Sequence, residues 1–323
     1  MKILIYGAGV IGSIFAAKLS LSGQDVTVLA RNKRFEEIKN AGIVLRHPQT
    51  MRLEKTMVKV IDCLPEDAVF DYILVVMQRN QVDAILPQLA KNPSKNVVFV
   101  VNTASGYSAW QKAIGTDRVM IGFPSAGGVR KDGIVDYFIG HGLMRVFQTT
   151  TFGECHGEQT PRVKTLIQAF RKAGIPTVFH RDMDVWQKTH VAIVTCIANA
   201  LYGHQCKHDE LARSRRDVLE MIQGIKEGFA VLRALGMRPT PAKLGYMDWP
   251  ASLLTPIFKI VLNTKLAETT MAQHCRVAQP EMICLQQEFD ALIVESNIPT
   301  PHITALKEKL LNNGTVGEKT IQG

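Results

Sequence analysis

Residues 1–19, MKILIYGAGVIGSIFAAKL, read as a short apolar strand, a glycine turn and an apolar-periodic helix. The glycines follow the spacing G-x-G-x-x-G at positions 7, 9 and 12. In such a βα turn the first glycine permits the tight turn, the second lets the backbone approach a pyrophosphate, and the third allows close packing of helix on sheet. The helix N-terminus adds free N–H groups and a positive dipole end. We therefore predict a dinucleotide site rather than a plain glycine-rich turn, formed by Gly7, Ala8, Gly9, Val10, Ile11 and Gly12.

The second predicted strand, DVTVLA at 25–30, indicates which dinucleotide is bound. NAD-binding units usually place Asp or Glu about 20 residues past the glycines, where the carboxylate holds the ribose 2′-hydroxyl. Here that position is Arg31, with Lys33 and Arg34 close behind. A carboxylate would repel a 2′-phosphate, whereas a guanidinium pairs with it. The prediction is NADP(H); the alternative is a solvated basic loop.

Strands and helices alternate up to about residue 180, which predicts an α/β fold with a Rossmann-type, doubly wound parallel sheet. The expected strands cover 2–6, 25–30, 72–77, 96–101, 119–122 and 176–179, and the expected helices 10–22, 34–40, 82–91, 108–114 and 161–173. Residues 42–46 and 51–54 suggest an inserted hairpin, and 134–139 with 143–147 an antiparallel extension. The glycines at 127 and 128 indicate either a close approach to a ligand or a flexible turn.

Beyond residue 180 the pattern becomes helical throughout, with helices expected at 185–202, 210–235, 256–270, 280–296 and 302–311. Asp182 can cap the first of them, and Gly236 ends the second. We therefore divide the chain into an NADP-binding domain, 1–180, and an all-helical substrate and catalytic domain, 181–323.

Composition narrows the functional class. The chain has 323 residues, 46% of them hydrophobic, and a net charge of +9. Its basic residues are dispersed and no nucleic-acid-binding motif occurs, so we expect the charge to attract an anionic cofactor and substrate, not nucleic acid. No signal peptide or membrane span is expected. The six cysteines lack C-x-x-C spacing, which predicts reduced thiols and a cytoplasmic protein.

Several motifs occur together: GAGVIG at 7–12, Arg31, Asn102 after a strand, Lys-Asp-Gly at 131–133, Trp-Gln-Lys at 186–188 and Pro-Glu at 280–281. With this combination the chain resembles the ketopantoate reductase (2-dehydropantoate 2-reductase) family over essentially its whole length. The resemblance implies an NADP-dependent oxidoreductase of pantothenate biosynthesis that reduces a 2-keto acid, with ketopantoate reduced to pantoate as the first candidate. A homodimer through the helical domain follows only by analogy.

The resemblance also implies roles for individual residues. Lys188 would be the general acid that protonates the carbonyl oxygen. Glu281 would bind a substrate hydroxyl, and Thr270 aligns with a serine that holds the substrate carboxylate. Asn102 would line the nicotinamide side of the site, in contact with cofactor and substrate. Three of these residues have an ordinary alternative: Lys188 as a solvated lysine, Glu281 as a glutamate in the first turn of a helix, and Asn102 as an asparagine ending a strand.

This chain departs from the family pattern at several positions. Two asparagines that follow the lysine by four and eight residues are replaced by Ala192 and Cys196, which we expect on the substrate-facing side of the helix. Gln78 stands for a lysine near the cofactor, and His274 for an aspartate. These changes leave two alternatives open: a reductase of a different, less polar carbonyl compound, or a non-catalytic NADP(H)-binding sensor.

Other groups of residues give weaker indications of function. His204, Cys206 and His208 could supply part of a metal site, but they follow a predicted helix end, and we expect no metal. Cys196 as a nucleophile would need a nearby base, and His190 lies on another helix face. Opine or polyol-phosphate dehydrogenases would need a His–Asp or paired-lysine arrangement, which the sequence does not place.

Overall fold

The structure is a computed structural model that describes residues 1–47, 50–139 and 149–312. Its backbone contacts divide the chain into two compact units. Unit 1 comprises Met1–Asn102 and Gly106–Met183, and unit 2 comprises Thr103–Ser105 with the described residues from Asp184 onward. The predicted boundary at residue 180 does not include the assignment of Thr103–Ser105 to unit 2.

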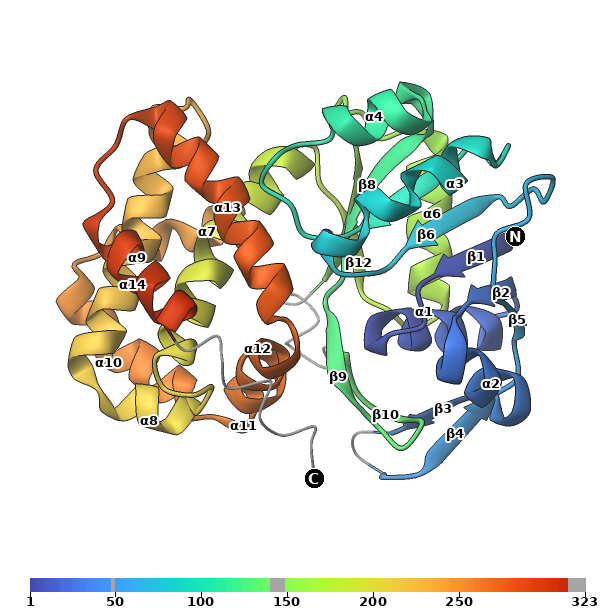
Figure 1. Cartoon of the computed structure of the whole chain (residues 1–323), viewed down its shortest axis with the longest axis horizontal. Helices are drawn as coiled ribbons and strands as arrows, with labels where there is room; N and C mark the ends of the chain where they lie inside the picture. Colours follow the sequence, from blue (N-terminus) through green and yellow to red (C-terminus); the bar gives the residue numbers. More distant parts are fainter. Residues whose placement is uncertain (48–49, 140–148, 313–323) are drawn as a thin grey trace. The chain divides into compact units, whose positions relative to one another are not determined.

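Unit 1 is built on an eight-stranded sheet in the order β12-β11-β8-β7-β6-β1-β2-β5 (Figure 1). Neighbouring strands are parallel except β8 and β11, which are antiparallel. The bounds are β1 Lys2–Tyr6, β2 Asp25–Leu29, β5 Lys59–Ile61, β6 Tyr72–Val75, β7 Val97–Val100, β8 Val119–Phe123, β11 Thr150–Glu154 and β12 Thr177–Phe179. The predicted α/β class with a Rossmann-type sheet is confirmed.

Side-chain alternation along the strands explains why this sheet is covered on both faces. In β1, Ile3 and Ile5 enter one apolar cluster while Leu4 and Tyr6 enter another. The first cluster contains residues of α1 (Val10–Leu21) and α6 (Pro161–Lys172), and the second contains residues of α3 (Leu86–Lys91) and α4 (Ser108–Ile114).

The helix predicted over 82–91 is shorter in the structure, since Asp83–Ile85 forms a 3₁₀ turn, η2, and another 3₁₀ turn, η1, spans Arg79–Gln81. Strand β2 leads into α2, Asn32–Ala41.

A second, four-stranded sheet in the order β4-β3-β10-β9 packs on α1. The predicted hairpin is confirmed as β3, Ile43–Arg46, and β4, Leu53–Thr56. Strand β10, Ile134–Ile139, lies between β3 and β9, Ala126–Lys131, and the expected partner at 143–147 lies outside the described residues. Gly127 and Gly128 belong to β9, so the flexible-turn interpretation is wrong: a Cβ at Gly128 would lie 2.1 Å from the Asp136 oxygen of β10.

The described part of unit 2 is helical, as predicted. Helix α7, Met183–Tyr202, is followed by further helices around a common apolar core. Their bounds are α8 His208–Arg213, α9 Arg215–Ala234, η4 Ala242–Asp248, α10 Ala251–Leu262, α11 Lys265–Ala267, the π-helical η5 Glu268–Ala272, α12 Gln273–Val277, α13 Gln279–Ser296 and α14 Pro301–Asn312.

Two expected helices in unit 2 are wrong in extent. The single helix over 210–235 is broken at Ser214, whose side chain caps α9 by accepting a hydrogen bond from the Asp217 N–H. The helix over 256–270 begins earlier, so Pro256 lies inside α10 and the remainder forms separate turns. A capping serine within an apolar-periodic stretch leaves the periodicity almost unchanged, which is why the break is hard to predict.

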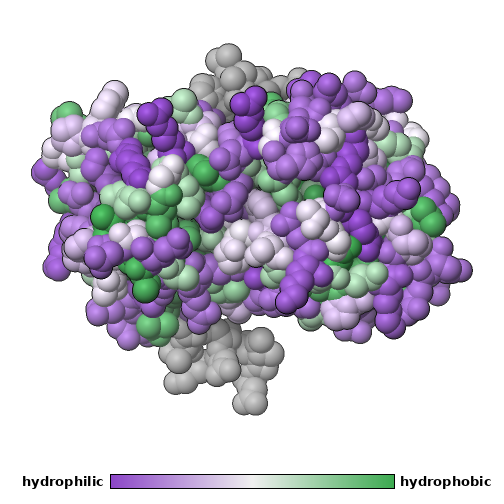
Figure 2. Space-filling model, turned by 90° about the horizontal axis from the view of Figure 1, so that it is seen from above, coloured by the Kyte–Doolittle hydropathy of each residue, from purple (hydrophilic) through white to green (hydrophobic). Residues whose placement is uncertain are grey.

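Hydrophilic residues cover most of the face shown in Figure 2, with hydrophobic residues in small groups between them. Within the described residues, no helix is sufficiently long and apolar to cross a membrane.

Candidate functional site

The glycine turn between β1 and α1 is tight at two positions and open at the third. Gly7 has φ +118°, and a Cβ there would lie 2.2 Å from the Val76 oxygen. A Cβ on Gly12 would lie 1.9 Å from the Gly7 oxygen. At Gly9, by contrast, a Cβ would meet nothing within 4 Å. The turn therefore packs closely on the sheet while its middle glycine leaves space for a ligand.

The N-terminus of α1 is suited to an anion. Its first helical hydrogen bond runs from the Ser13 N–H to the Gly9 oxygen at 3.0 Å. The N–H groups of Val10, Ile11 and Gly12 precede that bond, so the helix supplies no acceptor for them. No acidic residue occupies the first turn and no side chain caps it. These donors and the helix dipole can hold a pyrophosphate beside Gly9.

The basic residues after β2 take different places. Arg31 is exposed and donates from Nη2 to the Tyr6 hydroxyl at 3.2 Å. Arg34 is buried and donates to the Ala8 oxygen at 3.2 Å and to the Ser13 hydroxyl at 2.9 Å. Burial lowers the pKa of Arg34. Arg34 thus braces the glycine turn from within, and Arg31 is left facing solvent.

Two further predicted cofactor residues follow adjacent strands. Gln78 comes after β6, at the residue before the 3₁₀ turn η1, while Asn102 comes after β7. Strands β7, β6, β1 and β2 are neighbours and parallel, so Asn102, Gln78, the glycine turn and Arg31 lie along one edge of the sheet. That carboxyl edge is where open α/β sheets bind ligands. The Oδ1 atom of Asn102 is buried and has no hydrogen-bond partner in the described structure.

Lys188 lies near the start of α7, with its Nζ atom 2.6 Å from Oδ2 of Asp184 one turn earlier. Its side chain is only 12% exposed. The carboxylate keeps the ammonium group in place and limits its rotamers.

Ala192 and Cys196 do not lie as expected. They are 1% and 2% exposed and belong to the core of unit 2. A Cβ on Gly228 of α9 would lie 3.0 Å from Ala192 Cβ, and one on Gly224 would lie 3.2 Å from Cys196 Sγ. Both side chains therefore face α9 across a close helix contact, which corrects the expectation of a substrate-facing surface. Burial raises the pKa of Cys196 to about 12, which argues against a thiolate nucleophile.

A histidine and carboxylate cluster lies on another side of α7. His190 stacks on Trp186 with ring centroids 5.7 Å apart, and His274 Nε2 lies 3.7 Å from the Glu281 carboxylate. Burial, together with the nearby His274, lowers the pKa of His190 to about 4. Burial also lowers the pKa of His274, and Glu281 is 4% exposed. The sequence hinted at this pair only through His274 replacing an expected aspartate.

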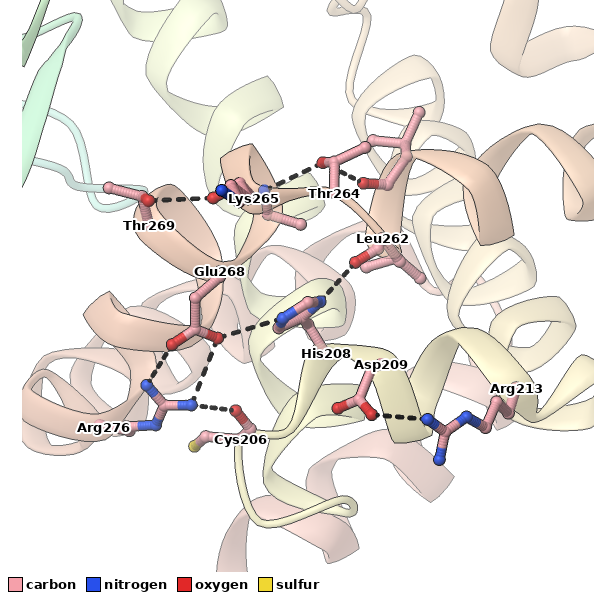
Figure 3. A network of polar contacts seen from close by, with 12 residues as sticks. Cys206, His208, Asp209, Arg213, Leu262, Thr264, Lys265, Glu268, Thr269 and Arg276 are labelled. Carbon is pink, nitrogen blue, oxygen red and sulfur yellow. Dashed lines mark hydrogen bonds and ion pairs between the residues drawn. The ribbon is translucent and has the colours of Figure 1, made fainter. Parts of the chain in front are cut away.

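Thr270 lies in the π-helical turn η5, which begins at Glu268 and is held by the network in Figure 3. Arg276 donates to both Glu268 oxygens, at 2.6 and 3.4 Å, and to the Cys206 oxygen at 3.1 Å. His208 places Nε2 3.3 Å from Glu268 and Nδ1 2.7 Å from the Leu262 oxygen (Figure 3). The Arg276 hydrogen bonds lower the pKa of Glu268.

These contacts bear on the metal alternative. His208 belongs to the network around Glu268, and His204 lies 3.1 Å from Asp217. Over residues 1–47, 50–139 and 149–312, no group of three or more His, Cys, Asp or Glu side chains is placed to hold a metal ion.

The segment after Asn102 reveals a residue that the sequence did not single out. Glu288 of α13 accepts hydrogen bonds from Thr103 Oγ1 at 2.9 Å, the Ala104 N–H at 2.7 Å and Ser105 Oγ at 3.1 Å. These contacts explain why Thr103–Ser105 groups with unit 2. A glutamate in a helix carries no local signal for a partner 183–185 residues away.

Comparison with known proteins shows which sequences this chain is similar to. A sequence model described as "Ketopantoate reductase PanE/ApbA" matches residues 3–153. An uncharacterized oxidoreductase, YkpB, of Bacillus subtilis is 26% identical over 58% of this chain and 61% of its own length. A 2-dehydropantoate 2-reductase of Mesorhizobium japonicum is 28% identical over 58% of this chain and 63% of its own. The matched regions thus span less than two thirds of these relatives.

Solved structures agree on the fold. A 2-dehydropantoate 2-reductase of Geobacter metallireducens has a TM-score of 0.79 at 19% identity, covering 97% of this chain and 99% of that one. A D-mandelate dehydrogenase solved with NADH and anilino(oxo)acetate has a TM-score of 0.78 at 14% identity, covering 97% and 98%. The family model and the sequence relatives thus make the N-terminal part of the chain similar to ketopantoate reductases, and the solved structures show that the chain as a whole shares their fold.

Proposed function

We propose that the protein is an NADPH-dependent oxidoreductase that reduces a 2-keto acid to a 2-hydroxy acid, with ketopantoate as the first candidate substrate. The observation that carries this proposal is the open Gly9 at the uncapped N-terminus of α1, with the Arg31 guanidinium at the end of the neighbouring strand. A pyrophosphate is bound by backbone N–H groups that it can reach without steric hindrance, and a 2′-phosphate is bound by a cationic side chain.

The residues along the carboxyl edge of the sheet fit such a cofactor. The Gly7–Gly12 turn would hold the pyrophosphate, Arg31 the 2′-phosphate, and Gln78 and Asn102 the nicotinamide part. The buried Asn102 Oδ1 atom has no hydrogen-bond donor in the described structure, and the carboxamide N–H of the nicotinamide would supply one. When bound, NADPH supplies a hydride to the substrate carbonyl carbon.

Carbonyl reduction requires one proton in addition to the hydride, and we assign its delivery to Lys188. The Nζ atom carries a transferable proton, and Asp184 at 2.6 Å holds it in one orientation. Thr270 is proposed for the substrate carboxylate and Glu281 for a substrate hydroxyl. His274 lies beside this carboxylate, with Nε2 3.7 Å away, which is too far for a direct hydrogen bond.

A second candidate is reduction of a less polar carbonyl compound. Ala192 and Cys196 stand where the family has asparagines, and both are packed into the core against α9. No amide is offered at these two positions, and the same fold also belongs to a D-mandelate dehydrogenase. We further propose a reducing compartment such as the cytoplasm, which the six free cysteines support.

The test is NADPH oxidation by the purified protein with ketopantoate and with a panel of aliphatic and aromatic 2-keto acids. Lys188→Ala should lower turnover by about 10²–10⁴-fold and leave NADPH binding nearly intact. Lys207→Ala is the matched control, because Lys207 also pairs with a carboxylate in unit 2 but is 51% exposed.

Each outcome separates the alternatives. Turnover of ketopantoate supports the first candidate, and turnover of another keto acid alone supports the second. Tight NADPH binding without any turnover indicates a non-catalytic sensor. Unchanged turnover in Lys188→Ala would remove Lys188 from the reaction.

A further inference from the structure

The basic residues after β2 differ in what holds their charge. Arg34 is 8% exposed and pairs with Glu37 at 3.0 Å, so its charge is already matched inside the protein. Arg31 is exposed, and its hydrogen bond goes to a neutral hydroxyl, that of Tyr6. A phenol can orient a guanidinium without neutralising it, whereas a carboxylate partner would compete with a ligand anion.

The hydrogen bonds at Tyr6 run in one direction. The Tyr6 hydroxyl donates to Oε1 of Gln88 on α3 at 2.6 Å. Its proton is thereby engaged, so its oxygen is left to accept from Arg31 Nη2 at 3.2 Å. Gln88 is itself tied to the backbone through Nε2, 3.4 Å from the Leu64 oxygen. Three side chains thus form a relay from a fixed backbone to an exposed cation.

Tyr6 is well placed to serve as the rigid member of this relay. It is 2% exposed, ends β1 and directly precedes Gly7. Burial raises the pKa of Tyr6, although the nearby Arg31 acts in the opposite direction. The phenol therefore stays neutral and protonated at physiological pH, as donation to Gln88 requires.

We propose that Tyr6, oriented by Gln88, is a specificity-determining positioning residue that holds the Arg31 guanidinium ready for a nucleotide 2′-phosphate. This inference rests on the proposed function and adds a discriminating element to it. An exposed arginine loses side-chain freedom when it binds an anion. Because Tyr6 restricts Arg31 beforehand, less of that loss is left for the binding step, and only a ligand with the 2′-phosphate benefits.

The test is titration of the full-length protein with NADPH and, separately, NADH, followed by nicotinamide fluorescence. Tyr6→Phe should weaken NADPH binding about five- to tenfold and leave NADH binding unchanged. Arg31→Ala should have the larger effect on NADPH. The double variant should be no weaker than Arg31→Ala alone, because Tyr6 acts through Arg31.

Tyr72→Phe is the matched control. It removes another tyrosine hydroxyl from the neighbouring strand β6, one that donates to the Arg162 oxygen at 2.8 Å. This variant should keep the wild-type ratio of the two affinities. Gln88→Leu interrupts the relay at its half-buried end and provides a second test in case Tyr6→Phe folds poorly. This variant should also weaken NADPH binding and leave NADH binding unchanged.

The outcomes distinguish this inference from the proposed function. If the wild-type protein binds neither nucleotide, the dinucleotide proposal itself fails. If the wild-type protein prefers NADPH but Tyr6→Phe and Gln88→Leu keep that preference, only the role of Tyr6 is refuted. Equal weakening of NADPH and NADH would also refute it, since that result indicates a general disturbance of the glycine turn.

Discussion

Alanine substitution at two glycines of the same turn should have opposite consequences. At Gly12 the new Cβ would lie 1.9 Å from the Gly7 oxygen and 3.0 Å from its carbonyl carbon, and both are backbone atoms. The intrinsic gain of alanine in a helix, about 1 kcal/mol, is smaller than the usual cost of overpacking, about 1–3 kcal/mol, and this overlap is severe. Gly12→Ala should therefore lower the free energy of unfolding by about 2 kcal/mol.

At Gly9 the new Cβ would meet nothing within 4 Å, and φ is −68°, a value open to any residue. Gly9→Ala should therefore keep the free energy of unfolding within about 0.5 kcal/mol of wild type. Its methyl group would occupy the space through which we propose that the pyrophosphate approaches. Losing one hydrogen bond to a charged group costs about 1.5–3 kcal/mol, so NADPH should bind about 10- to 150-fold more weakly.

Thermal and urea unfolding measure the first effect, and fluorescence titration with NADPH measures the second. A loss of about 2 kcal/mol should lower the Tm of Gly12→Ala by roughly 4–8 °C. Wild-type NADPH affinity in Gly9→Ala would refute the placement of the pyrophosphate at this turn. Equal destabilisation of both variants would refute the contrast between a packed and an open glycine.

Two further predictions concern unit 2. Ala192→Asn would restore the family residue but should destabilise the protein by about 1–3 kcal/mol and not improve ketopantoate turnover, because Ala192 is 1% exposed and faces Gly228; urea unfolding and activity assays would check this. Desolvation raises the pKa of Asp217, but hydrogen bonds from Ser214, Lys309 and His204 outweigh it and hold the pKa at about 2. Because this folded-state pKa lies below the ordinary value of 3.8, the stabilisation is complete above about pH 5 and is lost as pH falls toward 2. Asp217→Asn should thus lower the free energy of unfolding by on the order of 2 kcal/mol at pH 7, and the difference from wild type should narrow in urea curves below pH 4; a constant difference would contradict it.

Local patterns account for the parts of the fold that the sequence predicts. The β1–turn–α1 unit, the hairpin of β3 and β4, and the helices α1, α4 and α13 follow from periodicity, glycine spacing and turn residues within a few positions. The β9 strand was missed because its glycines resemble a turn and become a strand only through pairing with β10.

The candidate site divides in the same way. The places of the glycine turn and of Arg31 at the sheet edge were predictable, because each directly follows a strand of the βαβ unit. The orientation of Ala192 and Cys196 was not, since helical spacing shows which residues share a face but not which neighbour that face meets.

The sequence by itself determined the α/β-then-helical order, the glycine turn and the basic residues after β2, because each depends on residues close together in the chain. Only the tertiary structure decided which of those basic residues stays exposed, that Tyr6 and Gln88 hold it, and that Glu288 binds Thr103–Ser105. It likewise brought His274 to Glu281 and turned Ala192 toward α9. The physical reason is that the burial of a side chain and its hydrogen-bond partners depend on contacts between residues far apart in the sequence. Composition and periodicity contain no information about those contacts.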